Sequence, residues 1–423
     1  MGLLFKIKNI LNFLKTSDLS DRLIHTLLLI TLFRLGGFIF LPGVNEEHIT
    51  RYTDGLLGLL DVFLGGAFSN LSIFGLGVMP YISASIITHL STLLFPSFKK
   101  IQMDGQSGRV RLNQITKYLT IFIAIIHSIA FMSYSVTDKL ILINKYYFIF
   151  IAAFILTAGS MFCVWIGERI TDNGLGQGIS MLIFVGIVSS LPSAVYNEYC
   201  LKKNDIVTFV IEMLALFIII ILTTAVHMAV RKVTLVYINE IIEYRKIASL
   251  RQYFPIKMIS AGVMPIIFAQ VLIFFIGFIF NLLSKYSELA TNIYTSLSDN
   301  MSWGYNITFA ILIIIFTFLY IAINFNTMRI AEDLKRSSAI IPGVKPGTET
   351  AKHIDKILLR TVTPGAIILA IIALLPAVAY SFGVDRSLGR FYGGTTLLII
   401  IPVVYECISQ INSFWIHHKY SEI

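Results

Sequence analysis

The stretch VTFVIEMLALFIIIILTTAVHMAV at residues 207–230 decides the fold class. Glu212 is its only Asp, Glu, Lys or Arg, and aliphatic side chains dominate the rest. A helix must contribute about 20 predominantly apolar residues to cross the hydrocarbon core of a bilayer. This stretch therefore predicts a membrane-spanning α-helix.

Apolar segments of this kind recur along the chain. The stretch GLLGLLDVFLGGAF at 55–68 is too short to span, so we predict a re-entrant element there, which is stable only where protein or water surrounds it. Ten longer segments are predicted to span the membrane, at 23–42, 74–94, 116–136, 147–166, 178–197, 207–230, 257–283, 306–326, 361–381 and 392–413.

The composition excludes the main soluble classes. Charged residues make up 13% of the 423 residues, against about 25% in ordinary soluble domains. Coiled coils and disordered chains need many charges. The three cysteines, Cys163, Cys200 and Cys407, are scattered and fit neither a disulfide framework nor a metal site. The composition therefore indicates an all-α membrane protein.

The distribution of basic residues predicts the topology. With ten spans and a cytoplasmic N-terminus, 24 of the 33 Lys and Arg fall in cytoplasmic segments and 8 in outer loops. Positive residues collect on the cytoplasmic side, so both termini are expected there. The net charge of +9 is spread over alternate loops, which argues against a specific nucleic-acid site. Segment 1–22 is basic and amphipathic, as expected of a membrane-surface segment. No cleavable signal peptide is expected.

A weak internal repeat divides the chain into two halves, 23–200 and 201–423. The tetrapeptide GVMP occurs at 77–80 and again at 262–265, in the second and seventh predicted spans. The fifth span opens GISMLIF and the tenth opens GTTLLII. Five spans in each half would place the halves in opposite orientations, as in inverted-repeat membrane proteins.

Two cytoplasmic loops, at about 231–256 and 327–360, are long and rich in basic residues. They are either solvated tethers or a docking surface for a soluble partner. Two Pro-Gly pairs, at 342–343 and 346–347, predict an ordered turn at the tip of the second loop.

No motif of catalysis, nucleotide binding or metal binding stands out. Gly174, Gly176 and Gly178 do not follow a strand, and we interpret them as a flexible start to the fifth span. Few carboxylates are predicted deep in the spans, which disfavours an ion-coupled transporter with inverted repeats. The lack of a convergent catalytic set disfavours an intramembrane enzyme. No cofactor is expected.

Several long segments resemble the SecY family of protein-conducting channel subunits. The matches run in the family's order along the chain and cover nearly all of it, and the ten predicted spans agree with the family's topology. The matching segments are GGAFSNLSIFGLGVMPYISAS at 65–85, SGRVRLNQITKYLT at 107–120, GSMFCVWIGERITDNGLGQGISMLIFVGIVSSLP at 159–192, IPGVKPGTETAKHIDK at 341–356 and FYGGTTLLIIIPVV at 391–404.

The resemblance implies two inverted five-helix halves around an hourglass pore. An aliphatic ring would form its waist, at positions Val78, Ile82, Ile179, Ile183, Ile267 and Ile399. Such side chains dewet a narrow pore against ions yet make no lasting polar contact with a passing chain. Without the resemblance, these residues would be interpreted as ordinary lipid-facing or core-facing aliphatics.

The resemblance also implies moving parts. A short plug helix falls at about 56–68, with Gly65 and Gly66 as its hinge. A lateral gate would lie between spans 2–3 and spans 7–8, and Ser83 and His127 are predicted to contribute a polar contact there.

The basic loops become partner sites by the same resemblance, with Arg231, Lys232, Lys345, Lys352 and Lys356 as docking residues. The implied partners are the ribosome, the motor ATPase SecA, the membrane subunits SecE and SecG, and signal sequences of preproteins, with SecDF and YidC as further candidates. The implied location is the bacterial inner membrane, and the implied role is a channel without enzymatic activity.

Two departures bear on docking. Lys345 stands where the family usually has Arg, which keeps the charge but not bidentate recognition. The first loop begins HMAVRK at 227–232 instead of with the usual Glu-Arg-Gly-x-Arg-Arg.

Overall fold

The computed structural model describes residues 17–44, 61, 64–135, 144–203, 205–237, 252–259, 262, 264–283, 287–299 and 302–421. They form two compact units. The first takes the described residues of Met1–Ile206 and Ile399–Ile423 together with Ser298–Asn300, and the second takes those of Val207–Leu297 and Met301–Leu398. Each unit is described by itself. Residues 1–16 of the predicted N-terminal surface segment, 1–22, lie outside the described residues, and 17–22 form the start of the first helix.

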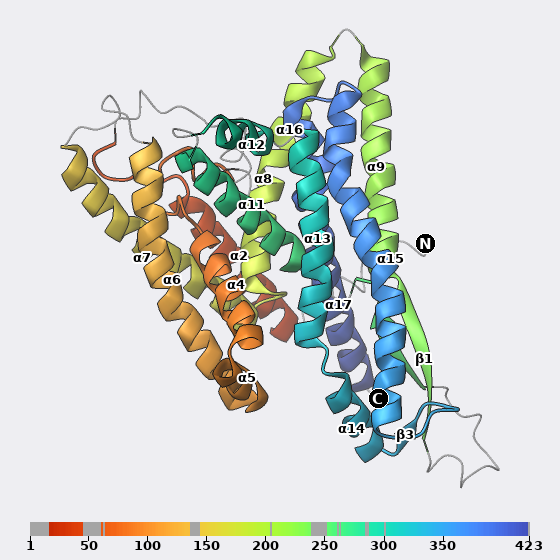
Figure 1. Ribbon diagram of the computed structural model, residues 1–423. Coiled ribbons are helices and arrows are strands. Elements are labelled where there is room, and N and C mark those ends of the chain that lie inside the picture. The colour runs from red at the N-terminus through yellow and green to blue at the C-terminus, as the bar shows by residue number, and fades with distance from the viewer. Residues whose placement is uncertain are drawn as a thin grey trace. The chain divides into compact units, whose positions relative to one another are not determined.

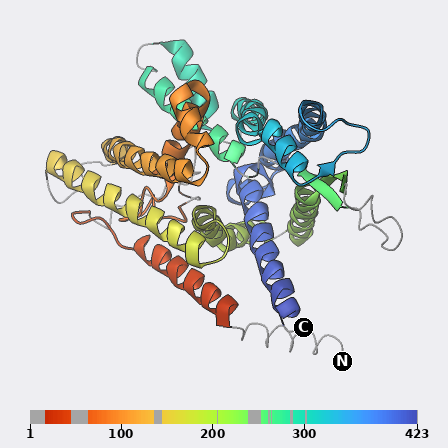
Figure 2. The same ribbon diagram turned by 90° about the horizontal axis from the view of Figure 1, so that it is seen from below.

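The first unit is built on helices that pack side by side (Figure 1). In chain order they are α2 (Ser17–Gly36), α4 (Met79–Leu94), α5 (Pro96–Met103), α6 (Gln106–Ser135), α7 (Lys145–Asn173) and α8 (Gly178–Leu201). Helix α6 packs between α4 and α7, and α2 runs alongside α7, which Figure 2 shows in red and yellow. A buried hydrogen bond of 3.1 Å from Thr116 to Thr88 joins α6 to α4.

The second unit combines helices with a small sheet. Its helices are α9 (Ile206–Met228), α11 (Met264–Leu283), α12 (Glu288–Ser298), α13 (Trp303–Asn324), α14 (Thr327–Arg336), α15 (Thr348–Ser381) and the short α16 (Arg386–Gly389), followed by the 3-10 turn η2 (Arg390–Tyr392). Helix α13 packs on both α11 and α15. The last helix, α17 (Gly394–Ser421), begins in this unit and continues in the first.

The two long connections predicted at 231–256 and 327–360 contain regular secondary structure where the structure describes them. Strand β1 (Val230–Tyr237) pairs antiparallel with both β2 (Gln252–Lys257) and β3 (Ala339–Ile340), in the order β2-β1-β3. Helix α14 and the first thirteen residues of α15 fill most of the rest of 327–360. Val233 and Leu235 are buried and Thr234 between them is exposed, so β1 has one apolar face. That face joins a core shared with α13 and α15, which orders these segments.

Apolar helices long enough to cross a membrane are present in both units. Among the described residues seven helices meet that test, namely α6, α7, α8, α9, α13, α15 and α17, and the bent pair of α4 and α5 raises the number to eight. Helix α6 begins ten residues before its predicted span and α15 thirteen residues before its own. The chain is therefore a multi-pass membrane protein whose helices extend beyond the apolar segments.

The two GVMP tetrapeptides have the same local structure. Gly77 and Gly262 take left-handed φ values of +49° and +60°, and α4 and α11 both begin at the Met that follows two residues later. Likewise, α8 begins at Gly178 and α17 at Gly394. The repeated sequences thus start equivalent helices in the two halves of the chain.

Candidate functional site

The predicted ring residues lie near helix starts. Val78 caps α4, and Ile82 follows one turn later on the same face; both are buried. Ile179 and Ile183 form the matching pair on α8, where Ile183 is buried and Ile179 is half-buried. The Cγ1 of Ile179 lies 2.9 Å from where a Cβ on Gly167 of α7 would be, so this side chain packs against α7.

The two remaining ring residues lie on later helices. Ile399 is buried on α17 and belongs to the first unit with the four residues above. Ile267 is buried on α11 and belongs to the second unit. The six residues are therefore aliphatic, mostly buried, and divided between the units five to one.

The C-terminal part of the predicted plug is tightly packed. Of 56–68, the structure describes Asp61 and 64–68, and the rest lies outside the described residues. Ala67 and Phe68 are each 4% exposed and belong to a core cluster with side chains of α6 and α7. The Phe68 ring lies 4.1 Å from the Phe131 ring, centroid to centroid. Side-chain packing therefore anchors this segment to the helices around it.

Polar contacts fix the backbone around the predicted hinge. Gly65 and Gly66 take φ values of +61° and +89°, which favour glycine. The guanidinium of Arg34, on α2, donates a 3.1 Å hydrogen bond to the carbonyl of Gly65. Asp61 accepts two 2.8 Å hydrogen bonds from Ser69, one from its backbone N–H and one from its hydroxyl. Arg34 falls inside the first predicted span, at 23–42, but sequence analysis gave it no role, although a cation within a span is a signal of function.

The two predicted gate residues lie on adjacent helices, α4 and α6. Ser83 is buried, and its hydroxyl donates a 3.2 Å hydrogen bond to the carbonyl of Met79 in its own helix. His127 is half-buried on α6. Their contribution to a gate with spans 7 and 8 stays a prediction.

The glycine-rich turn before α8 has a different role from the one predicted. Its glycines allow close approach rather than flexibility: a Cβ on Gly178 would overlap the backbone carbonyl of Gly167 on α7. A Cβ on Gly174 would lie 2.5 Å from the hydroxyl of Thr26 on α2. The interpretation as a flexible helix start is therefore wrong, because the turn is wedged against its neighbours.

Hydrogen bonds tie this turn to three other helices. The N–H of Leu175 donates to the hydroxyl of Thr26 on α2 (3.1 Å), and that of Gly176 to Oε1 of Gln410 on α17 (2.8 Å). The N–H of Gly178 donates to the hydroxyl of Thr171 on α7 (2.9 Å). The turn thus links α2, α7, α8 and α17 within one unit, which no local sequence signal would have indicated.

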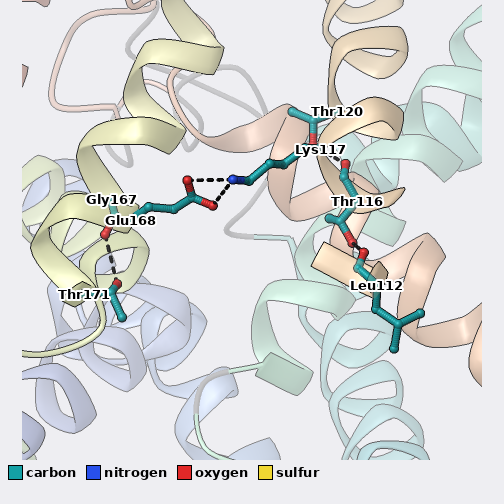
Figure 3. Close-up of polar contacts among 7 residues, drawn as sticks. All are labelled: Leu112, Thr116, Lys117, Thr120, Gly167, Glu168 and Thr171. Carbon is teal, nitrogen blue, oxygen red and sulfur yellow. Dashed lines mark hydrogen bonds and ion pairs between the residues drawn. The ribbon is translucent and has the colours of Figure 1, made fainter. Parts of the chain in front are cut away.

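An ion pair joins α6 and α7 near this turn. Figure 3 shows the Lys117 ammonium between the two carboxylate oxygens of Glu168, at 2.7 and 2.8 Å. The two side chains are 40% and 37% exposed, so solvent screens the pair and its contribution to stability is small.

The five predicted docking residues are all exposed and belong to the second unit. Arg231 and Lys232 lie on β1, and Lys232 stacks over the Tyr253 ring at 5.7 Å. Lys345 lies in the turn that the two Pro-Gly pairs predicted, which the structure confirms, and its carbonyl accepts a 2.8 Å hydrogen bond from Thr350. Figure 1 shows β1, β3, α14 and the start of α15 gathered at one end of this unit.

Metal chemistry finds no support in the part of the chain that the structure describes, where no group of three or more His, Cys, Asp or Glu side chains is placed to hold an ion. The features assembled here are buried aliphatic residues, a packed segment with a polar hinge, and a structured basic surface.

The fold is that of protein-conducting channels. A solved structure described as a protein-conducting channel matches 97% of this chain and 94% of its own, with a TM-score of 0.67 and 15% identity. Another, whose description says that the plug domain of SecY stabilises the closed state, matches with a TM-score of 0.66 and 18% identity, over 97% of this chain and 94% of its own.

The sequence is similar to curated proteins over nearly its whole length. A protein translocase subunit SecY of Buchnera aphidicola is 33% identical over 96% of this chain and 95% of its own. The subunit of the same name from Aquifex aeolicus is 35% identical over 95% of this chain and 96% of its own. The SecY family model matches residues 72–408. The chain belongs to the SecY family.

Proposed function

We propose that this chain is the channel subunit of a protein translocase, which passes unfolded preproteins across a membrane and releases apolar segments sideways into lipid. Family membership over residues 72–408 carries the proposal. The fold and the buried aliphatic residues near the starts of α4, α8 and α11 agree with it.

The proposed topology has ten spans and two inverted five-helix halves, 23–200 and 201–423, with both termini in the cytoplasm of a bacterial cell. Helices α2, α4 and α11 complete the ten in this scheme, in addition to the seven that are long and apolar enough by themselves. The equivalent helix starts at the two GVMP sequences support the repeat. The threefold bias of basic residues supports the orientation.

The proposed path runs through the aliphatic ring, with segment 56–68 as a plug that closes it. β-Branched side chains hold a narrow pore dry against ions, because a dewetted constriction offers no replacement for an ion's hydration shell. A chain that leaves sideways as a helix satisfies its own backbone hydrogen bonds in lipid, so release through a gate near Ser83 and His127 is physically allowed.

The channel itself is proposed to be passive, with energy supplied by partners. The exposed basic residues around β1 and the 341–347 turn form an ordered surface, suited to an acidic or RNA-bearing partner. A similar solved structure is described as Sec61 in a ribosome-channel complex, with a TM-score of 0.64. We propose the ribosome and SecA at this surface, and SecE and SecG in the bilayer; SecDF and YidC are further candidates.

Ion conductance in planar bilayers tests the proposal, with the purified full chain compared with a variant that lacks residues 56–68. A tight wild type and a conducting deletion variant are expected. If neither protein conducts ions, even with a signal peptide added, the result would contradict the pore and favour an inverted-repeat transporter.

A further inference from the structure

The contact between Arg34 and Gly65 joins a charged side chain to the proposed hinge. Arg34 lies in the last turn of α2, and its Nη1 donates a 3.1 Å hydrogen bond to the Gly65 carbonyl. A partly buried Arg near the end of a spanning helix either reaches the interface or pairs with a polar group. Here its partner is the Gly65 carbonyl, in the part of the plug segment that packs in the core through Leu64, Ala67 and Phe68.

The fit around Gly65 leaves no room for a side chain. A Cβ there would overlap Nη1 of Arg34 and lie 2.8 Å from the hydroxyl oxygen of Ser189 on α8. The guanidinium is also placed by the Phe38 ring, 5.7 Å from its Cζ. The φ of +61° favours glycine at position 65, and a Cβ there would push the end of the Arg34 side chain out of its present position.

We propose that Arg34 is a positioning residue that latches the plug hinge to α2 and so raises the free energy of plug displacement. The inference rests on the proposed function, because it assumes that 56–68 is a plug. It adds one barrier to opening of the channel, because the charge-assisted hydrogen bond from Arg34 to Gly65 must break before the hinge can move away from α2.

Substitution of Arg34 tests the latch in planar bilayers, with the full chain purified together with its membrane partners. Arg34→Met keeps the length and apolar stem of the side chain but removes the donors, and we expect about a tenfold rise in closed-state ion leak, the low end for loss of a hydrogen bond to a charged group. Arg34→Lys keeps a charged donor and should restore most of the seal.

Arg22→Met is the matched control. Arg22 lies on the same helix, donates to the carbonyl of Gly174 at 3.5 Å and stacks over the Phe414 ring at 5.2 Å, but it does not contact the hinge. Its substitution should leave the leak at the wild-type level. An equal leak in Arg22→Met and Arg34→Met would reduce the effect to general loosening of α2 and overturn the latch.

A double-mutant cycle shows whether Arg34 acts through Gly65. Gly65→Ala should leak by itself, because its Cβ displaces the guanidinium. If both changes break one contact, Arg34→Met with Gly65→Ala leaks no more than the worse single variant, whereas effects that multiply would contradict the latch.

Deletion of 56–68 separates failure of the latch from failure of the plug. A conducting deletion variant with a tight Arg34→Met would overturn the latch and leave the plug intact. A tight deletion variant would overturn both.

Thiol labelling provides a second measurement that does not depend on conductance. In a background with both Cys200→Ser and Cys407→Ser, which leaves only the buried Cys163, Ala67→Cys replaces a buried residue next to the hinge, and Arg34→Met should speed its labelling by an impermeant reagent about tenfold. Unchanged labelling would contradict the latch.

Discussion

Truncation of Phe68 tests how the plug segment is held. Phe68 is 4% exposed, packs in a core cluster of the first unit, and has its ring 4.1 Å from that of Phe131. Displacement of the whole predicted plug, 56–68, takes Phe68 out of that packing, whereas a swing at Gly65 and Gly66 alone would leave Phe68 in place. Phe68→Ala should therefore favour the open state.

The expected shift toward the open state follows from the burial of the Phe68 side chain. Truncation of a core Phe to Ala typically costs about 3–5 kcal/mol. The lower value of about 3 kcal/mol corresponds to roughly a 100-fold change in an equilibrium constant, so the open fraction should rise by up to about 100-fold. We expect a correspondingly higher frequency of ion-conducting openings in planar bilayers without any substrate.

Phe148→Ala is the control for general destabilisation. Phe148 lies on α7 in the same cluster and is 2% exposed, so its loss leaves a similar cavity. It belongs to a fixed helix rather than to the plug segment, and its substitution should lower thermal stability without raising the leak. Equal leaks in the two variants would refute the reasoning, as would a Phe68→Ala channel as tight as wild type.

Three further predictions concern the surrounding structure. Gly178→Ala forces α7 and α8 apart and should lower the free energy of unfolding by about 1–3 kcal/mol, which speeds thiol labelling of the buried Cys163. Gly343→Ala is the control, because a Cβ there meets no neighbouring atom, and it should leave the labelling of Cys163 unchanged. Burial raises the pKa of Asp385, but hydrogen bonds from the next two residues and a nearby Arg outweigh burial and lower the pKa overall. The ionised Asp385 therefore stabilises the fold at neutral pH, and this contribution is lost as the pH falls through the lowered pKa. Asp385→Asn should make the melting temperature depend less on pH in the acid range. Lys117→Met should change the free energy of unfolding by no more than about 1 kcal/mol, because its ion pair is solvent-screened, and a larger loss in denaturant unfolding would contradict this.

The membrane helices were predictable because their signal is local. A run of about 20 apolar residues contains the whole requirement for a span. Each predicted span overlaps a helix in the described residues, and the Pro-Gly turn at 342–347 was predicted from its own residues. Helix ends were not predictable in this way. Helices α6 and α15 continue into polar sequence, where hydropathy no longer marks them.

Long-range contacts account for the features that the sequence did not reveal. Strand β1 pairs with β3, which lies about 100 residues later in the chain, so strands from the two predicted loops belong to one sheet, and no local signal indicates such a pairing. The turn at 174–178 looked flexible because α2 and α17, which contact Gly174 and Gly176, come from distant parts of the chain. For the same reason, Arg34 was visible as a cation in a span, but its partner Gly65 was not.

Photo-crosslinking to a stalled preprotein tests the central claim most directly. A photoreactive residue at Ile82 or Ile183, both buried and predicted to line the pore, is compared with one at Ile218, which is 56% exposed on α9. The account predicts adducts between the two ring positions and the translocating chain, and none at Ile218. Adducts at Ile218 alone, or at none of the three positions while translocation proceeds, would contradict a polypeptide path through this ring.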